Sequence, residues 1–346
     1  MRKNSGIARL VCVFAICIAL IGYNAYSFCF KGRTAKNVIT QNPVQEETAS
    51  EEENEKEKEK VQREDTLSSQ EETESAPAST DGSVKGKVIS RYISPYSAGL
   101  SYNGVYMKNS TDLEINIKEL LSAPLGFKIA KNDSPQVLIV HTHTTETYMT
   151  EDADYYTSAF SSRTRDAQKN MVSVGNIVAE KLNQAGIKTL HDATEHDYPN
   201  YTGSYSRAAK TINGYLKKYP TIKVVLDLHR DAVSSGDSDK VKLVTEINGK
   251  KAAQVMLVMG SQSGSVTNFP KWKENLKLAV RLQQKIEEKY PTLARPLSLM
   301  PKNYNESLTT GSLLIEFGTD VNTLSEAHYS AELVGNAIAE LLGGIT

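Results

Sequence analysis

Histidines and carboxylates follow three apolar segments of this chain. The first segment runs into His141, His143 and Glu146, the second into His229, and the third into Glu316. Imidazole nitrogens and carboxylate oxygens are ligands suited to zinc. These residue types therefore indicate metal chemistry, if the fold brings the three segment ends together.

The apolar segments themselves read as buried strands. Four branched apolar residues in a row at 137–140 are typical of a strand covered on both faces. In α/β folds, ligands gather just past the carboxyl ends of such strands, which lie on one edge of a parallel sheet. His141 and His143 share a face if the strand continues through them. We therefore expect the histidines and acids to converge at one edge.

A catalytic zinc needs three protein ligands and an open position for water. We expect His143 and His229 to be ligands, because two histidines at the ends of independent buried strands each need a partner. A carboxylate outside the ligand set can take the water's proton and pass it on, and Glu316 is the candidate for this base. His141 is either a ligand or a catalytic residue that orients substrate or stabilises an oxyanion.

The neighbours of these residues have simpler interpretations. Asp227 is expected to anchor His229 from the same strand face. Arg230 is either a surface charge or a clamp for a substrate carboxylate. A long, tyrosine-rich loop at 148–156, followed by Arg163, can fold over a substrate, so Arg163 is a second candidate for substrate binding. Three further histidines are interpreted as structural: His191, His196 and His328.

The pattern beyond Pro135 alternates between strands and helices. Asn248-Gly249 is a strong hairpin signal, so one antiparallel hairpin is expected. The pattern otherwise predicts an α/β fold with a mostly parallel sheet flanked by helices. Predicted helices cover 115–121, 169–185, 206–218, 272–290 and 325–342; predicted strands cover 137–140, 188–190, 223–228, 241–247, 253–259 and 312–317.

The first part of the chain predicts a membrane anchor. Basic residues precede an apolar run from about Leu10 to Phe30, long enough to cross a bilayer with a cytoplasmic N-terminus. A cleaved signal peptide is the alternative, because Ala25-Tyr-Ser27 resembles a cleavage site. In both cases the folded part is exported. We assign residues 1–36 to this segment.

Composition then divides the remaining chain. Residues 46–74 hold thirteen acidic and four basic residues and almost no apolar ones, which predicts a solvated, disordered linker over 37–85. Residues 86–133 form an N-terminal annex and 134–346 the catalytic domain. All three cysteines lie before position 30, which excludes thiol catalysis and disulfides from the exported part. The folded part has no stripe of basic residues, so nucleic acid is not an expected partner.

Taken together, these features resemble the stage II sporulation protein P family. The resemblance covers the N-terminal segment, the acidic linker and three motifs: His141-Thr-His143-Thr-Thr-Glu146, Leu226-Asp-Leu-His229-Arg230-Asp231 and Leu314-Ile-Glu316-Phe-Gly318. It implies an N-acetylmuramoyl-L-alanine amidase with additional endopeptidase activity on peptidoglycan. It also implies work at the mother-cell membrane during engulfment, facing the intermembrane space, beside stage II sporulation proteins D and M.

The family is similar to the zinc-dependent muramoyl amidases, which use two histidines, a helix-opening glutamate and a catalytic glutamate. His143, His229 and Glu316 match three of these positions, but the helix here opens at Asp166 without a glutamate. Glu146 is therefore the expected third ligand, with Asp166 in reserve. The competing functions are a wall-binding scaffold without catalysis and a metal-free hydrolase that uses a Ser or Thr near His141.

Overall fold

The computed structural model describes residues 82–345. The predicted membrane segment, and the predicted linker up to residue 81, lie outside the described residues. Among the helices that are described, none is both long and apolar enough to cross a membrane.

Two sheets form the framework. The larger has eight strands, which in spatial order are β2 (Leu100–Tyr102), β3 (Val105–Asn109), β12 (Leu297–Met300), β11 (Val255–Gly260), β13 (Ser312–Thr319), β7 (Val224–Asp231), β4 (Val137–Val140) and β6 (Thr189–His191). The four strands from β13 to β6 are parallel to one another. Their carboxyl ends therefore lie on one edge of the sheet, as the sequence predicts for the site.

The prediction of a mostly parallel sheet is wrong, because the sheet is mixed. Strand β11 runs antiparallel to β13, and β2 runs antiparallel to β3. A parallel neighbour requires a crossover connection. The chain instead enters β11 from a hairpin strand, β10 (Lys250–Ala253), with only Gln254 between them. No crossover helix lies between β7 and β11, so β11 does not run in the direction of β7 and β13.

The smaller sheet lies beside the larger one. It contains β10, β9 (Asp239–Ile247), β1 (Val84–Arg91) and β5 (Tyr155–Thr157) in that order, and the short β8 (Ser234–Ser235) pairs with β9. The predicted hairpin joins β9 to β10, and Asn248 and Gly249 both have positive φ, at 52° and 74°. Residues 86–133 supply strands to both sheets, besides the short helices η1 (Pro95–Ser97) and α3 (Ile117–Ser122).

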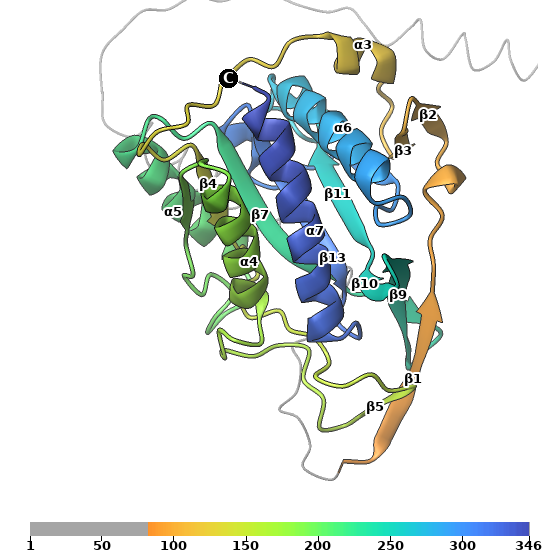
Figure 1. The fold of residues 1–346 in the computed structure, drawn as a ribbon. Helices are drawn as coiled ribbons and strands as arrows, with labels where there is room; N and C mark the ends of the chain where they lie inside the picture. The colour runs from red at the N-terminus through yellow and green to blue at the C-terminus, as the bar shows by residue number, and fades with distance from the viewer. Residues whose placement is uncertain (1–81, 346) are drawn as a thin grey trace, which may run out of the picture. The chain divides into compact units, whose positions relative to one another are not determined.

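Helices cover both faces of the larger sheet (Figure 1). Three long helices lie on one face: α4 (Met171–Gln184), α6 (Trp272–Lys289) and α7 (Leu324–Gly343). Helix α5 (Ser204–Lys218) covers the other face. The side chains of β4 show the division, since Val137 and Ile139 pack in the core with α4 and α7, whereas Leu138 and Val140 pack with α5. All four helices, and α3, begin and end within two residues of their predicted limits.

Candidate metal site

His143, Glu146 and His229 meet at the carboxyl ends of β4 and β7. Nδ1 of His143 lies 3.5 Å from Oε1 of Glu146, and Nδ1 of His229 lies 3.7 Å from Oε2 of the same carboxylate. All three side chains are buried, and their candidate ligand atoms lie within 4.8 Å of one another. The structure therefore brings together the three residues expected to bind metal.

The spacing suits a tetrahedral ion. With metal–ligand bonds near 2.0–2.1 Å, two ligands of a tetrahedral zinc lie about 3.4 Å apart. The two separations from Glu146 approach this value before any adjustment of the side chains. The donor set of two imidazoles and one carboxylate also matches that of catalytic zinc sites. The residues present therefore fit the metal that the sequence predicts.

Glu146 is held as a charged carboxylate by its surroundings. Burial alone would raise its pKa, but Arg230 and the two histidines outweigh burial and hold the pKa well below its ordinary value. The backbone N–H of Arg230 also donates to Glu146 Oε2 at 3.1 Å. A carboxylate that stays charged without a metal is ready to accept a divalent cation.

Arg230 acts inside the protein. The residue is 2% exposed, so its interpretation as a surface charge is wrong. Its guanidinium donates from Nε to the carbonyl of Thr147 and from Nη2 to the carbonyl of Ser162. These bonds fix the loop that follows β4 against the end of β7. Contact between Arg230 and a substrate stays a prediction.

Asp227 supports His229 from the same strand. Nε2 of His229 lies 3.0 Å from Asp227 Oδ1, although it is too far off line for a full hydrogen bond. Burial lowers the pKa of His229, but Asp227 outweighs this and, with Glu146 and Glu316, raises the pKa to about 10. Metal-ligating histidines commonly pair their second nitrogen with a carboxylate in this way. The expected anchoring role of Asp227 agrees with this geometry.

Glu316 lies on β13 at the position paired with His229. Its Oε2 atom is buried and has no hydrogen-bond partner within residues 82–345. Burial, reinforced by Asp231, raises its pKa to about 8. A general base works best when its pKa lies near the working pH. Glu316 therefore has the surroundings expected of a proton-transferring carboxylate.

His141 lies apart from the three ligand residues. Strand β4 ends at Val140, so the condition for His141 and His143 to share a face is not met. The His141 ring is fully buried, and its nitrogens contact the Leu228 carbonyl and His191. Burial, with help from His191, lowers its pKa to about 3, so the ring is neutral. A direct catalytic part for His141 stays a prediction.

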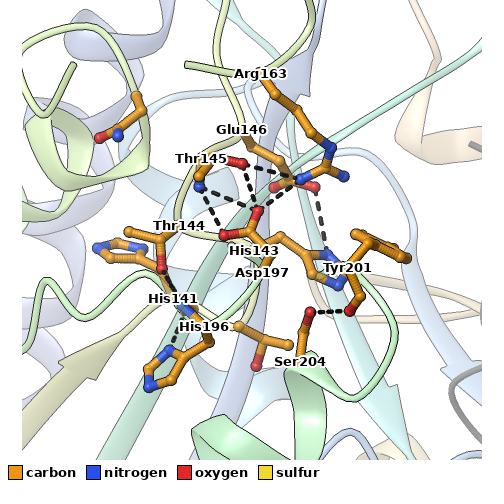
Figure 2. Close-up of polar contacts among 12 residues, drawn as sticks. His141, His143, Thr144, Thr145, Glu146, Arg163, His196, Asp197, Tyr201 and Ser204 are labelled. Atoms are coloured by element: carbon orange, nitrogen blue, oxygen red, sulfur yellow. Dashed lines mark hydrogen bonds and ion pairs between the residues drawn. The ribbon is translucent and has the colours of Figure 1, made fainter. Parts of the chain in front are cut away.

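A second polar network borders the site and includes Arg163. Figure 2 shows Arg163 and Thr145 converging on Asp197. Nη1 of Arg163 lies 2.7 Å from Oδ2 of Asp197. The Arg163 guanidinium also lies 4.7 Å from the ring centre of Tyr201, which stacks on His143 at 4.6 Å. Arg163 therefore contacts the residue that flanks a ligand histidine, while its binding to substrate stays a prediction.

The tyrosines beside the site come from segments that the sequence did not single out. Tyr201 and Tyr205 approach the His143 ring, and Tyr304 contacts Tyr205. By contrast, Tyr148 and Tyr156, from the aromatic loop expected over the site, are buried in the fold: the Tyr148 hydroxyl donates to the Phe317 carbonyl, and Tyr156 packs with Val88 and Val321. Tyrosine is common in turns, so these residues carry no signal in the sequence. In the structure, the positive φ angles of Tyr304 and Asn305 mark their loop as unusual.

The remaining candidates lie outside the metal site. The Asp166 side chain is 42% exposed and contacts Lys169. This reserve ligand therefore does not join His143 and His229 at the metal site. His196 bonds to the carbonyl of His141 and to Thr211, and His328 bonds to Ser173. Both histidines have the structural contacts expected of them.

The fold and the site define an α/β protein with a buried, two-histidine and one-glutamate candidate centre for a divalent metal. The chain belongs to the family described as Stage II sporulation protein P (SpoIIP), whose family model matches residues 16–339. The stage II sporulation protein P of Bacillus subtilis (strain 168) is 28% identical to it over 252 residues. That match covers 66% of this chain, which spans 58% of the length of the relative.

Solved structures of amidases resemble this fold more distantly. The N-acetylmuramoyl-L-alanine amidase AmiC2 of Nostoc punctiforme is 12% identical, with a TM-score of 0.35, and the match covers 62% of this chain and 98% of that one. The CwlD amidase of Clostridioides difficile, solved in complex with the GerS lipoprotein, is 9% identical, with a TM-score of 0.38, and the match covers 60% and 98%.

Proposed function

We propose that this protein is a zinc-dependent peptidoglycan hydrolase that cleaves the N-acetylmuramoyl-L-alanine amide bond. One observation carries the proposal: candidate ligand atoms of His143, Glu146 and His229 lie within 4.8 Å of one another at the strand ends. Membership of the stage II sporulation protein P family supports a cell-wall substrate. Additional endopeptidase activity on cross-links is part of the same proposal.

The residues divide the chemistry between them. His143, Glu146 and His229 would hold the zinc. When bound, zinc supplies a Lewis acid and lowers the pKa of water enough for it to lose a proton and attack near neutral pH. Glu316 takes the proton of the attacking water and then gives it to the leaving amine. Both steps can use one carboxyl group, because a pKa of about 8 lets Glu316 hold or release a proton near neutral pH.

The cellular part of the proposal follows from the family and from the chain before residue 82. The N-terminal segment would anchor the protein in the mother-cell membrane, with the folded part outside the cytoplasm. There the enzyme would act on peptidoglycan in the intermembrane space during engulfment. Stage II sporulation proteins D and M are the proposed partners.

A Glu316→Gln variant of the full chain tests the proposal. The wild type should create new amine termini in purified peptidoglycan, and the variant should lose this activity by about 100-fold or more while it still binds zinc. Glu288→Gln, an exposed change on α6, should behave as the wild type. Activity retained in Glu316→Gln would remove Glu316 from the mechanism.

Two other results would replace the proposal. Wild-type protein that binds peptidoglycan but creates no amine termini would be a scaffold. Activity that is insensitive to chelation would indicate a metal-free hydrolase.

A further inference from the structure

Strands β4 and β7 separate just before the metal site. Their last paired residues are Val140 and Asp227, although β7 continues to Asp231. Beyond this pair, side chains replace the sheet's backbone bonds. The N–H of Thr142 donates to Asp227 Oδ1 at 2.8 Å, and Nδ1 of His141 lies 2.9 Å from the Leu228 carbonyl oxygen. These two contacts connect the segment after β4, which carries His143, to the end of β7, which carries His229.

Only one hydrogen bond of His141 has a direction that its partner determines. A carbonyl oxygen only accepts, so Nδ1 of His141 must carry the proton that bonds to Leu228. Nε2 of His141 lies 2.8 Å from Nε2 of His191, and one of these two nitrogens donates to the other. His141 therefore joins His191, in β6, to the backbone of β7.

His191 is held on its other side by helix α4. Its Nδ1 atom lies 3.0 Å from Oδ1 of Asn176. Helix α4 therefore holds the His191 ring in place beside His141.

Gly175 leaves room for this contact. A Cβ atom at position 175 would lie 2.5 Å from Nε2 of His191 and 2.7 Å from Nε2 of His141. Both distances are too short for real atoms, so any side chain at this position would push the two rings apart. The hydrogen-bonded pair is thus built into the packing of α4 against β4 and β6.

We propose that His141 and His191 are positioning residues, and that the His191–His141–Leu228 hydrogen-bond chain sets the spacing between the ends of β4 and β7. Because His143 follows β4 and His229 lies in β7, this spacing sets the distance between the two ligand histidines. The functional consequence rests on the proposed zinc site. The hydrogen-bond chain itself does not, so the two can be tested separately.

The first test is independent of metal. The full-length, metal-free protein is labelled with 15N-histidine, and NMR identifies which ring nitrogen of His141 carries the proton. The chain contains six histidines, so a His141→Asn variant can assign the signal by its loss. A proton on Nδ1 of His141 is expected. An Nδ1 atom without a proton would overturn the inference, whether or not the protein binds zinc.

The second test measures zinc affinity by competition with a chelator. His191→Met removes the ring nitrogen that bonds to His141 and should weaken zinc binding about tenfold, as is usual when support behind a ligand is lost. His191→Gln keeps a side-chain amide that can bond to Nε2 of His141 and should remain within about threefold of the wild type. Unchanged affinity in His191→Met, or equal weakening in both variants, would overturn the inference.

A glycine pair provides a version of this test that removes no polar group. Gly175→Ala should weaken zinc binding because it pushes the two rings apart. Gly214→Ala is the matched control, since it also lies in a helix and has no atom within 4 Å of an added Cβ. Equal zinc affinity in these two variants would contradict the proposal. If the wild type bound no zinc, the proposed function would fail, and the NMR result would still decide the hydrogen-bond chain.

Discussion

His229 and Glu316 occupy paired positions on the neighbouring parallel strands β7 and β13. Their neighbours Leu228 and Ile315 pack in the core with α4 and α7, so His229 and Glu316 face the other side of the sheet. Neighbouring strands lie about 4.8 Å apart. The backbone hydrogen bonds of the sheet therefore fix the distance between a metal ligand and the proposed base.

Replacement of Asp227 by Asn should weaken zinc binding. Asn keeps an oxygen that can accept the bond from the Thr142 amide, but it removes the negative charge 3.0 Å from Nε2 of His229. We expect zinc affinity to fall about 10-fold to 100-fold, measured by competition with a chelator. Asp133→Asn, at an exposed position, serves as the control. Equal affinity in the two variants would show that Asp227 does not support the ligand.

Replacement of Arg230 by Met should destabilise the fold. It leaves the Glu146 carboxylate buried without its main positive neighbour and removes the donors to two loop carbonyls. The free energy of unfolding should fall by about 3 kcal/mol in denaturant titrations. Arg165→Met breaks an ion pair with Glu195 on the surface and should leave the stability at the wild-type value. A similarly small effect in Arg230→Met would contradict this account of Glu146.

Replacement of Glu306 by Gln should change how stability depends on pH. Burial raises the pKa of Glu306 well above its ordinary value of 4.5. A raised carboxyl pKa contributes stability that is fully present below pH 4.5 and is lost as pH rises towards the raised value. Between pH 5 and pH 8, the metal-free wild type should therefore lose more unfolding free energy than Glu306→Gln.

The control for Glu306 is Glu288→Gln, because Glu288 is exposed on α6. It should follow the pH dependence of the wild type. Equal slopes for Glu306→Gln and the wild type would mean that Glu306 is charged in the folded protein at neutral pH.

The sequence predicted the site where each residue lies in or directly after a long apolar strand. His229 and Glu316 belong to the runs that form β7 and β13, and the pairing of parallel strands then brought them together. The long helices were predicted well because their apolar residues repeat over several turns. Patterns of this length depend little on the rest of the fold.

Short and long-range features could not be predicted in this way. Strands of three residues, such as β2 and β5, are too short for a period to be recognised. The end of β4 at Val140 depends on side-chain contacts with Asp227 and Leu228, far away in sequence. This early end moves His141 away from the ligand site. Tyr205 and Tyr304 also reach the site through tertiary packing alone.

The most direct test of the account is the zinc content of the purified full-length protein, measured by mass spectrometry for the wild type and for His143→Ala and His229→Ala. His328→Ala serves as the control, because His328 bonds to Ser173 away from the site. We predict one zinc per chain in the wild type and the control, and almost none in the other two variants. Equal zinc content in all four proteins, or none in the wild type, would contradict the central claim.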